Sequence, residues 1–182
     1  MEKTINYKWK NTVPYLILAA VGICLLYRAR FGFIWSDESY YFEEAYRFLQ
    51  GDAPVVDDWY TSQLYSVLLI PYMYLWKCIA GIGFSYLFLF SRYLYVIIQF
   101  IAAVICYRIL RKRSCKAALI AAVLFMLFCR GNIATLSYYS ICTVCLFIAL
   151  LILFRVNESE KGTIPVMIFS GALSGIAIIC NP

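Results

Sequence analysis

Apolar residues in this chain are gathered into long runs that are separated by short polar segments. A helix needs about 20 apolar residues to cross a bilayer, and the pattern predicts about five membrane-crossing helices. The first lies within residues 13–31. The other four follow a long polar stretch and are Ser85–Tyr107, Ala117–Cys129, Leu136–Phe154 and Thr163–Cys180. The expected fold is therefore all-α, a polytopic bundle of transmembrane helices.

A further apolar segment, Leu64–Ala80, is ambiguous because it contains Pro71, Lys77 and several aromatic residues. If it does not cross, ten of the sixteen basic residues lie on the cytoplasmic side, among them the cluster from Arg108 to Lys116. Positive residues favour that side of a membrane. We therefore expect an in-plane or re-entrant helix on the outer side and a cytoplasmic N-terminus.

These assignments predict a single membrane domain over residues 1–182. Its parts are a cytoplasmic tail (1–12), a first span (13–31), an outer loop with two juxtamembrane helices (32–84) and four further spans (85–182).

Composition supports a membrane protein. Hydrophobic residues make up 64% of the chain and charged residues 14%, whereas soluble domains have roughly 45–50% and 25%. This excludes an aqueous single-domain enzyme. The net charge of +6 comes mostly from residues at the ends of apolar runs, so we expect no nucleic-acid partner. The chain has no His, which excludes a histidine base or metal ligand.

Seven of the ten acidic residues fall in the first outer loop. Ser36 or Asp37 is suited to cap a helix there, and Gly51 is suited to end it. The pattern predicts an amphipathic helix against the outer membrane surface, with Glu43 and Glu44 on its solvated face.

Asp37 stands between the apolar stretch Phe31–Trp35 and the aromatic face of this helix. Desolvation at such a boundary raises the pKa of a carboxyl group toward working pH, which suits a proton acceptor. A structural interpretation is also open, because acidic residues stabilise the positive end of a helix dipole. Asp57 and Asp58 likewise fit either a polar turn or a hard-oxygen site for a divalent cation.

The order of these features resembles the first outer loop of the GT-C superfamily of membrane glycosyltransferases. The nearer likeness is to bacterial members of the protein O-mannosyltransferase and lipid A aminoarabinose transferase branch. The residues that carry the resemblance are Asp37-Glu38-Ser39-Tyr40-Tyr41, Ala45, Leu49, Gly51-Asp52, Pro54, a short helix from Ser62 to Trp76, Arg92 at the following span, and the basic hinge Arg111-Lys112-Arg113.

The resemblance implies transfer of a sugar from a polyprenyl-phosphate donor to a lipid, glycan or protein acceptor on the outer face of the cell membrane. It implies that Asp37 is the catalytic carboxylate and that Glu38 is a supporting or metal-proximal group. The family's enzymes are longer, so the chain is expected to be the N-terminal portion of one.

The phosphate of such a donor needs a cation near the outer surface. Arg92 and Arg130 are the first candidates, and Arg28 and Arg30 come after them. Each is also explained as an interfacial anchor, because long basic side chains extend from helix ends toward water. Tyr138 lies in the outer turn where many relatives carry a second Asp, and we expect it to contact substrate. The rival hypothesis is a non-enzymatic membrane module, either a transporter fragment or a scaffold whose acidic outer loop binds a cationic partner.

Overall fold

The computed structural model describes residues 2–32, 37–53, 56–57, 64–80, 86–129, 133–159 and 164–180, with the backbone alone for residues 2–11, 37, 158 and 159. All regular structure within these ranges is helical. The helices are α1 (Glu2–Arg28), α2 (Asp37–Gln50), α3 (Leu64–Ala80), α4 (Leu87–Leu110), α5 (Cys115–Leu127), α6 (Tyr138–Ser159) and α7 (Ile164–Cys180). The prediction of an all-α fold is confirmed.

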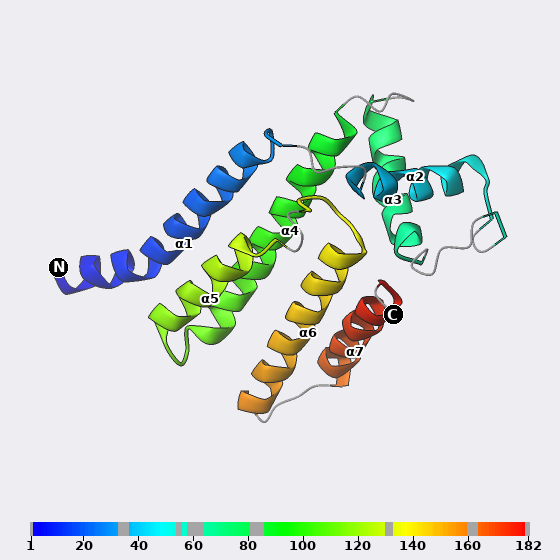
Figure 1. Ribbon diagram of the computed structural model, residues 1–182. Helices are drawn as coiled ribbons and strands as arrows, with labels where there is room; N and C mark the ends of the chain where they lie inside the picture. Colours follow the sequence, from blue (N-terminus) through cyan, green and yellow to red (C-terminus); the bar gives the residue numbers. More distant parts are fainter. Residues whose placement is uncertain are drawn as a thin grey trace.

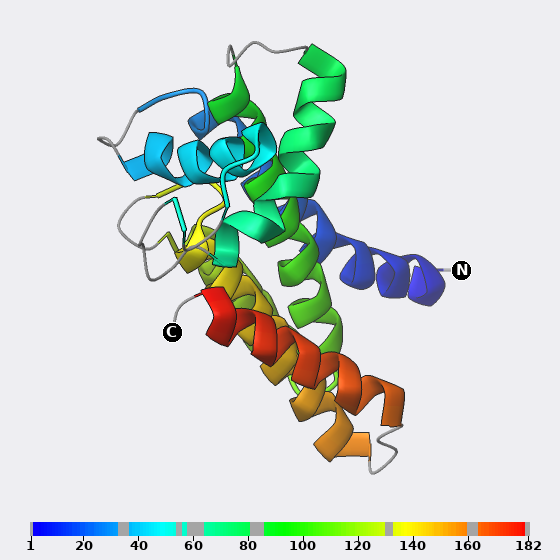
Figure 2. The ribbon, with the colours of Figure 1, turned by 90° about the vertical axis from the view of Figure 1, so that its right-hand side faces the viewer.

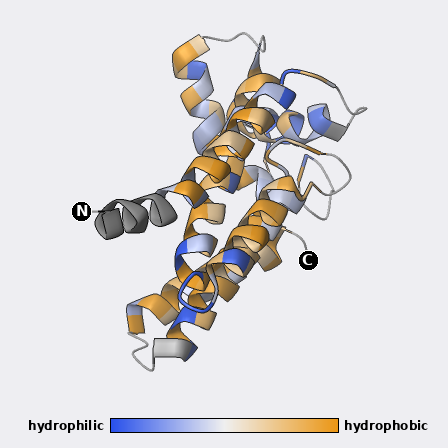
Figure 3. Cartoon of the chain, turned by 90° about the vertical axis from the view of Figure 1, so that its left-hand side faces the viewer, coloured by the Kyte–Doolittle hydropathy of each residue, from blue (hydrophilic) through white to orange (hydrophobic). Residues whose placement is uncertain are grey.

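Every apolar run identified in the sequence forms a helix, but the helices differ in length. Helix α4 and the Tyr138–Asn157 part of α6 are long and apolar enough to cross a membrane. Four other apolar helices are shorter, namely Thr12–Arg28, α3, α5 and α7. By length and composition the described residues thus contain two candidate spans, fewer than the five expected. Hydrophobic residues cover most of the long helices (Figure 3).

Helices α1, α4 and α5 lie side by side, and α6 and α7 form an adjacent hairpin (Figure 1). Small buried residues allow close approach of α4 and α5, with Ala102 and Ala103 on one helix and Ala118 and Ala122 on the other. The α6–α7 hairpin is joined by a hydrogen bond of 3.1 Å from the Ser170 hydroxyl to the carbonyl oxygen of Ala149. These contacts build the core on which the loop helices rest.

Helices α2 and α3 pack against each other at the end of the bundle opposite the α4–α5 turn (Figures 1 and 2). The two loop helices expected in this region are therefore present. The expected orientation of α2 is only partly right: Glu43 is exposed, as predicted, but residue Glu44 is only 3% exposed. The prediction that Glu44 lies on a solvated face is wrong, because α3 covers that side of α2 and supplies a hydrogen-bond donor to the carboxylate.

Candidate functional site

A buried ion pair joins the first turn of α2 to α4. The Nη2 atom of Arg92 lies 2.5 Å from Oε2 of Glu38, and the Glu38 side chain has no exposed surface. The Nη1 atom of Arg92 donates a hydrogen bond of 3.0 Å to the carbonyl oxygen of Ala29. Arg92 therefore connects α2 and the end of α1 to the bundle.

The backbone structure at the end of α1 explains why the carbonyl oxygen of Ala29 can accept a hydrogen bond from Arg92. The last carbonyl groups of a helix have no partner within it. The chain leaves α1 through a turn in which the Ala29 amide donates a hydrogen bond to the Leu25 carbonyl oxygen, and the Phe31 amide donates one to the Arg28 carbonyl oxygen. Gly32 follows with φ of +80°, a conformation that glycine adopts readily. The turn leaves the Ala29 oxygen directed at Arg92.

The ion pair is only partly satisfied within the described residues. Oε1 of Glu38 and Nε of Arg92 are both buried without a hydrogen-bond partner there. Buried polar atoms are normally paired with protein or water. The Arg92 side chain is 9% exposed, and the part that is not buried borders a cavity.

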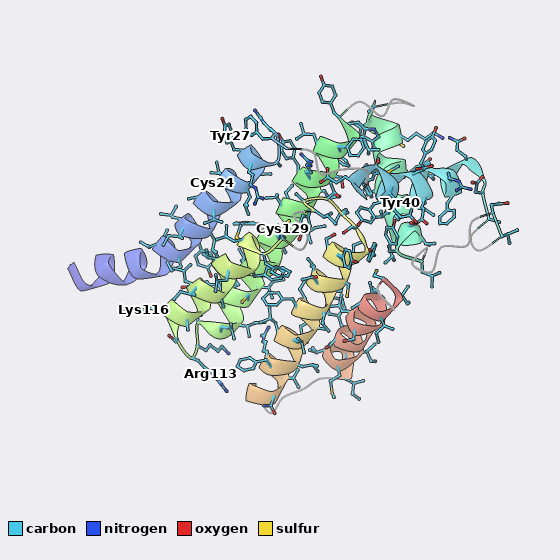
Figure 4. All side chains as sticks on the ribbon, in the orientation of Figure 1. Cys24, Tyr27, Tyr40, Arg113, Lys116 and Cys129 are labelled. Atoms are coloured by element: carbon cyan, nitrogen blue, oxygen red, sulfur yellow. The ribbon has the colours of Figure 1, made fainter. Side chains whose placement is uncertain are left out.

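A cavity of about 440 Å³ lies against Arg92, between α1, α4 and the end of α5. Most of its lining is apolar, and the charged groups that line it among the described residues are Arg28 and Arg92. The remaining lining residues are Leu25, Ala29, Phe31, Gly32, Tyr95, Val96, Gln99, Met126, Leu127, Cys129 and Ala134. Figure 4 labels Cys129 within the bundle, away from Arg113 and Lys116 at the α4–α5 turn. An apolar cavity with cations on its wall suits an amphiphilic anion.

A second buried carboxylate, that of Glu44, lies farther along α2. Its Oε2 accepts a hydrogen bond of 2.7 Å from the Ser66 hydroxyl, and its Oε1 accepts one of 3.1 Å from the Tyr40 hydroxyl. Burial raises the pKa of the neighbouring Tyr65 phenol well above its ordinary value, and the Glu44 charge adds to that shift. This phenol therefore stays protonated.

Tyr138 belongs to a packed aromatic cluster. At the start of α6 its ring centroid lies 5.5 Å from those of Tyr41 and Tyr65 and 4.0 Å from that of Tyr139. These contacts give Tyr138 a packing role between α2, α3 and α6. Its predicted contact with substrate remains a prediction.

The remaining predicted site residues are Asp37, Asp57, Asp58 and Arg130. Asp37 is the first residue of α2, next to Glu38, and its side chain lies outside the described part of the structure. Arg130 and Asp58 also lie outside the described residues. Asp57 is exposed, and its Oδ2 accepts a hydrogen bond of 2.7 Å from the Ala53 amide. No group of three metal-ligating side chains occurs among the described residues, so the metal site at Asp57 and Asp58 remains a prediction.

Sequence reasoning listed Arg92 and Glu38 separately and missed their pairing. It also missed Gln99, whose Nε2 donates to the Tyr95 hydroxyl at 2.9 Å and to the Phe128 carbonyl at 3.1 Å. A polar amide in the middle of an apolar span is rare enough to have indicated this site. Comparison with models of protein families, with curated proteins and with solved structures finds no match to this chain.

Proposed function

We propose that the chain is a membrane glycosyltransferase of the GT-C type, or part of one, which uses a sugar linked to polyprenyl phosphate. The observation that carries the proposal is the cavity of about 440 Å³ with Arg28 and Arg92 on its wall. Its apolar lining suits a lipid chain and its cations suit a phosphate. Asp37 is assigned to the site from the sequence, in which it directly precedes Glu38, the residue paired with Arg92.

In the proposed reaction the acceptor is a hydroxyl or amine on the outer face of the membrane. Its proton passes to the Asp37 carboxylate while its oxygen or nitrogen forms a bond to the anomeric carbon of the sugar. The bond between that carbon and the phosphate oxygen breaks, and its electron pair stays on the phosphate. Arg92 and Arg28 stabilise the negative charge that develops there.

The proposal includes a membrane arrangement with five spans, in which α1, α5 and α7 cross together with α4 and α6. It is supported by the basic α4–α5 turn, which lies at the end of the bundle opposite α2 and α3 (Figure 1). The segment from Arg108 to Lys116, which includes that turn, contains five Lys or Arg residues and no acid. Positive charge of this kind favours the cytoplasmic side, which leaves α2 and α3 outside.

The test is transfer of a radiolabelled sugar in proteoliposomes that contain the full chain. The donors are polyprenyl phosphates carrying mannose or aminoarabinose, and a cell-envelope extract supplies acceptors. We expect Asp37→Asn to lower the transfer rate by a factor of about 100 or more, because it removes the proton acceptor and keeps the side-chain shape. Glu43→Gln removes an exposed charge from the same helix and should leave the rate unchanged.

Equal rates for the wild type and Asp37→Asn would contradict the catalytic role of Asp37. Absence of transfer from both donors by the wild-type chain would favour the non-enzymatic module.

A further inference from the structure

We propose that the chain binds an anionic phospholipid at the α4–α5 turn, with the lipid phosphate on basic side chains and the acyl chains along exposed apolar sides of α4 and α5. The basic turn is the segment from Arg108 to Lys116, whose basic residues are Arg108, Arg111, Lys112, Arg113 and Lys116. Helix α5 begins at this turn and ends at the cavity with Arg92, roughly 20 Å away along its 13 residues. The two sites are distinct, and lipid binding at the turn does not depend on sugar transfer.

The positive charge of the basic turn does not depend on how its side chains pair. The sequence has no acid from residue 59 to residue 157. Two basic and two acidic residues lie at the end of α6 and just beyond it, namely Arg155, Glu158, Glu160 and Lys161. Residues 1–12 hold three Lys and one Glu. Ion pairing among all these groups therefore leaves the positive surplus of the turn in place.

The basic turn lies where two candidate membrane spans end. Helix α4 ends at Leu110, and the candidate span of α6 ends at Asn157. The Arg113 guanidinium carbon lies 4.7 Å from the centroid of the Phe154 ring, which places the turn against the end of α6. Figure 4 shows Arg113 and Lys116 at this end of the bundle. Lipid headgroups lie at the level where spans end, and clusters of about four to eight Lys or Arg residues there attract anionic headgroups.

Exposed side chains continue from the basic turn along both helices. All five basic residues of the turn are exposed. On α5, Lys116 is followed at intervals of four residues by Ile120 and Leu124, which are exposed and apolar. Residues four apart in a helix share one face. On α4, the exposed Ile101 lies seven residues, or two turns, before Arg108. Each helix thus carries a basic residue at the end of an exposed apolar side.

A phospholipid with net negative charge matches both parts of this surface. Its headgroup complements the positive surplus of the turn, and its acyl chains cover the apolar sides of the two helices. A soluble anion matches the basic residues alone and leaves Ile120 and Leu124 uncovered. A zwitterionic lipid covers the apolar sides but gains little from the positive surplus.

The first experiment compares two lipids on the full chain in dodecyl maltoside. Dioleoyl phosphatidylglycerol, which is anionic, and dioleoyl phosphatidylcholine, which is zwitterionic, are added in equal amounts, and native mass spectrometry counts the molecules bound. In about 0.1 M ammonium acetate we expect about tenfold more bound phosphatidylglycerol, since each Lys or Arg near a membrane surface contributes a factor of about five. At about 1 M the preference should fall to about threefold or less, because the Debye length is then about 3 Å.

The second experiment locates the bound lipid. Lys112→Gln combined with Lys116→Gln removes two exposed charges and should lower the preference for phosphatidylglycerol about fivefold or more. Lys112→Arg combined with Lys116→Arg keeps both charges and should retain the preference within about twofold. Lys77→Gln is the control for position. Lys77 is exposed and is the sole charged residue of α3, so its removal should leave the preference unchanged.

A third measurement uses the wild-type chain, so it decides the question even if the glutamine variant does not fold. Lys112 and Lys116 should react with an acetylating reagent at least about twofold more slowly with phosphatidylglycerol than with phosphatidylcholine. Lys77 should react equally in both lipids. Glycerophosphoglycerol, which has the headgroup without acyl chains, should displace less than about one tenth of the phosphatidylglycerol at equal concentration.

Three outcomes would overturn the lipid site. Equal binding of the two lipids by the wild type would show that the turn does not select an anionic headgroup. A preference that survives the glutamine variant, or equal lysine reactivity in the two lipids, would place the anionic lipid elsewhere on the chain. Equal competition by glycerophosphoglycerol would identify a simple anion site without a role for α4 and α5. None of these results bears on Asp37 or on sugar transfer, which are tested separately.

Discussion

Glu38 in the first turn of α2 and Gly51 just after its last residue hold the two ends of one helix by different means. Glu38 is buried and paired with Arg92, which lies 54 positions later in the chain. Gly51 has φ of +111°, and two backbone hydrogen bonds close the helix around it, from the Gly51 amide to Phe48 and from the Asp52 amide to Arg47. The first end depends on tertiary structure, whereas the second is local.

This difference shows that local interactions can be predicted from the sequence more readily than tertiary ones. A glycine that ends a helix acts through neighbouring backbone groups, and the bonding pattern here is the Schellman motif. A buried carboxylate such as that of Glu38 needs a partner from a distant part of the chain. The residues next to the carboxylate in the sequence do not indicate which residue that partner is.

Arg92→Met should have the largest effect on stability. It leaves the Glu38 carboxylate buried without its cation, and removal of one partner from a buried ion pair costs about 3–5 kcal/mol. The measurement is the free energy of unfolding in dodecyl maltoside, by titration with sodium dodecyl sulfate.

The double variant Glu38→Leu with Arg92→Met is the control. It removes both charges, so it should recover most of the lost stability. A double variant as unstable as Arg92→Met alone would contradict an ionic link at this end of the helix.

Glu44→Gln should have a smaller effect than Arg92→Met, although both affect buried carboxylates of α2. The partners of Glu44 among the described residues are the hydroxyls of Ser66 and Tyr40, and glutamine retains one oxygen that can accept from them. We expect a loss of about 1–2 kcal/mol in the same unfolding measurement. A loss as large as that of Arg92→Met would indicate that Glu44 also depends on a cation.

These two carboxylates also mark the limit of what the sequence predicts. Apolar runs predicted six of the seven helices in the described residues, and capping residues with an amphipathic pattern predicted α2, because helix formation follows the local sequence. The prediction that Glu44 faces solvent failed because the position of α3 over α2 depends on contacts between segments that are distant in the sequence. The pairing of Glu38 with Arg92 was missed for the same reason, although both residues had been singled out.

Gly51→Ala tests the local end of α2. A Cβ atom at Gly51 would meet no atom within 4 Å, so the cost comes from the backbone conformation alone. A non-glycine residue at positive φ costs about 1–2 kcal/mol, and we expect a loss near the lower value. Gly175 in α7 is the matched control, because its Cβ would also meet open space. Gly175→Ala should be neutral or stabilising by up to about 1 kcal/mol, since alanine favours a helix interior.

Arg47→Gln should have the smallest effect, even though Arg47 lies at the same end of α2 as Gly51. Its Nε is 2.6 Å from Oδ2 of Asp52, but the two side chains are 37% and 35% exposed. Such pairs contribute about 0–1 kcal/mol and are screened by salt. The backbone bond from the Asp52 amide to the Arg47 carbonyl does not depend on the arginine side chain and should persist. We therefore expect a loss below about 1 kcal/mol that shrinks further between about 0.05 M and about 1 M NaCl. A loss well above about 1 kcal/mol would mean that this end of α2, like the other, depends on a side-chain contact rather than on its backbone.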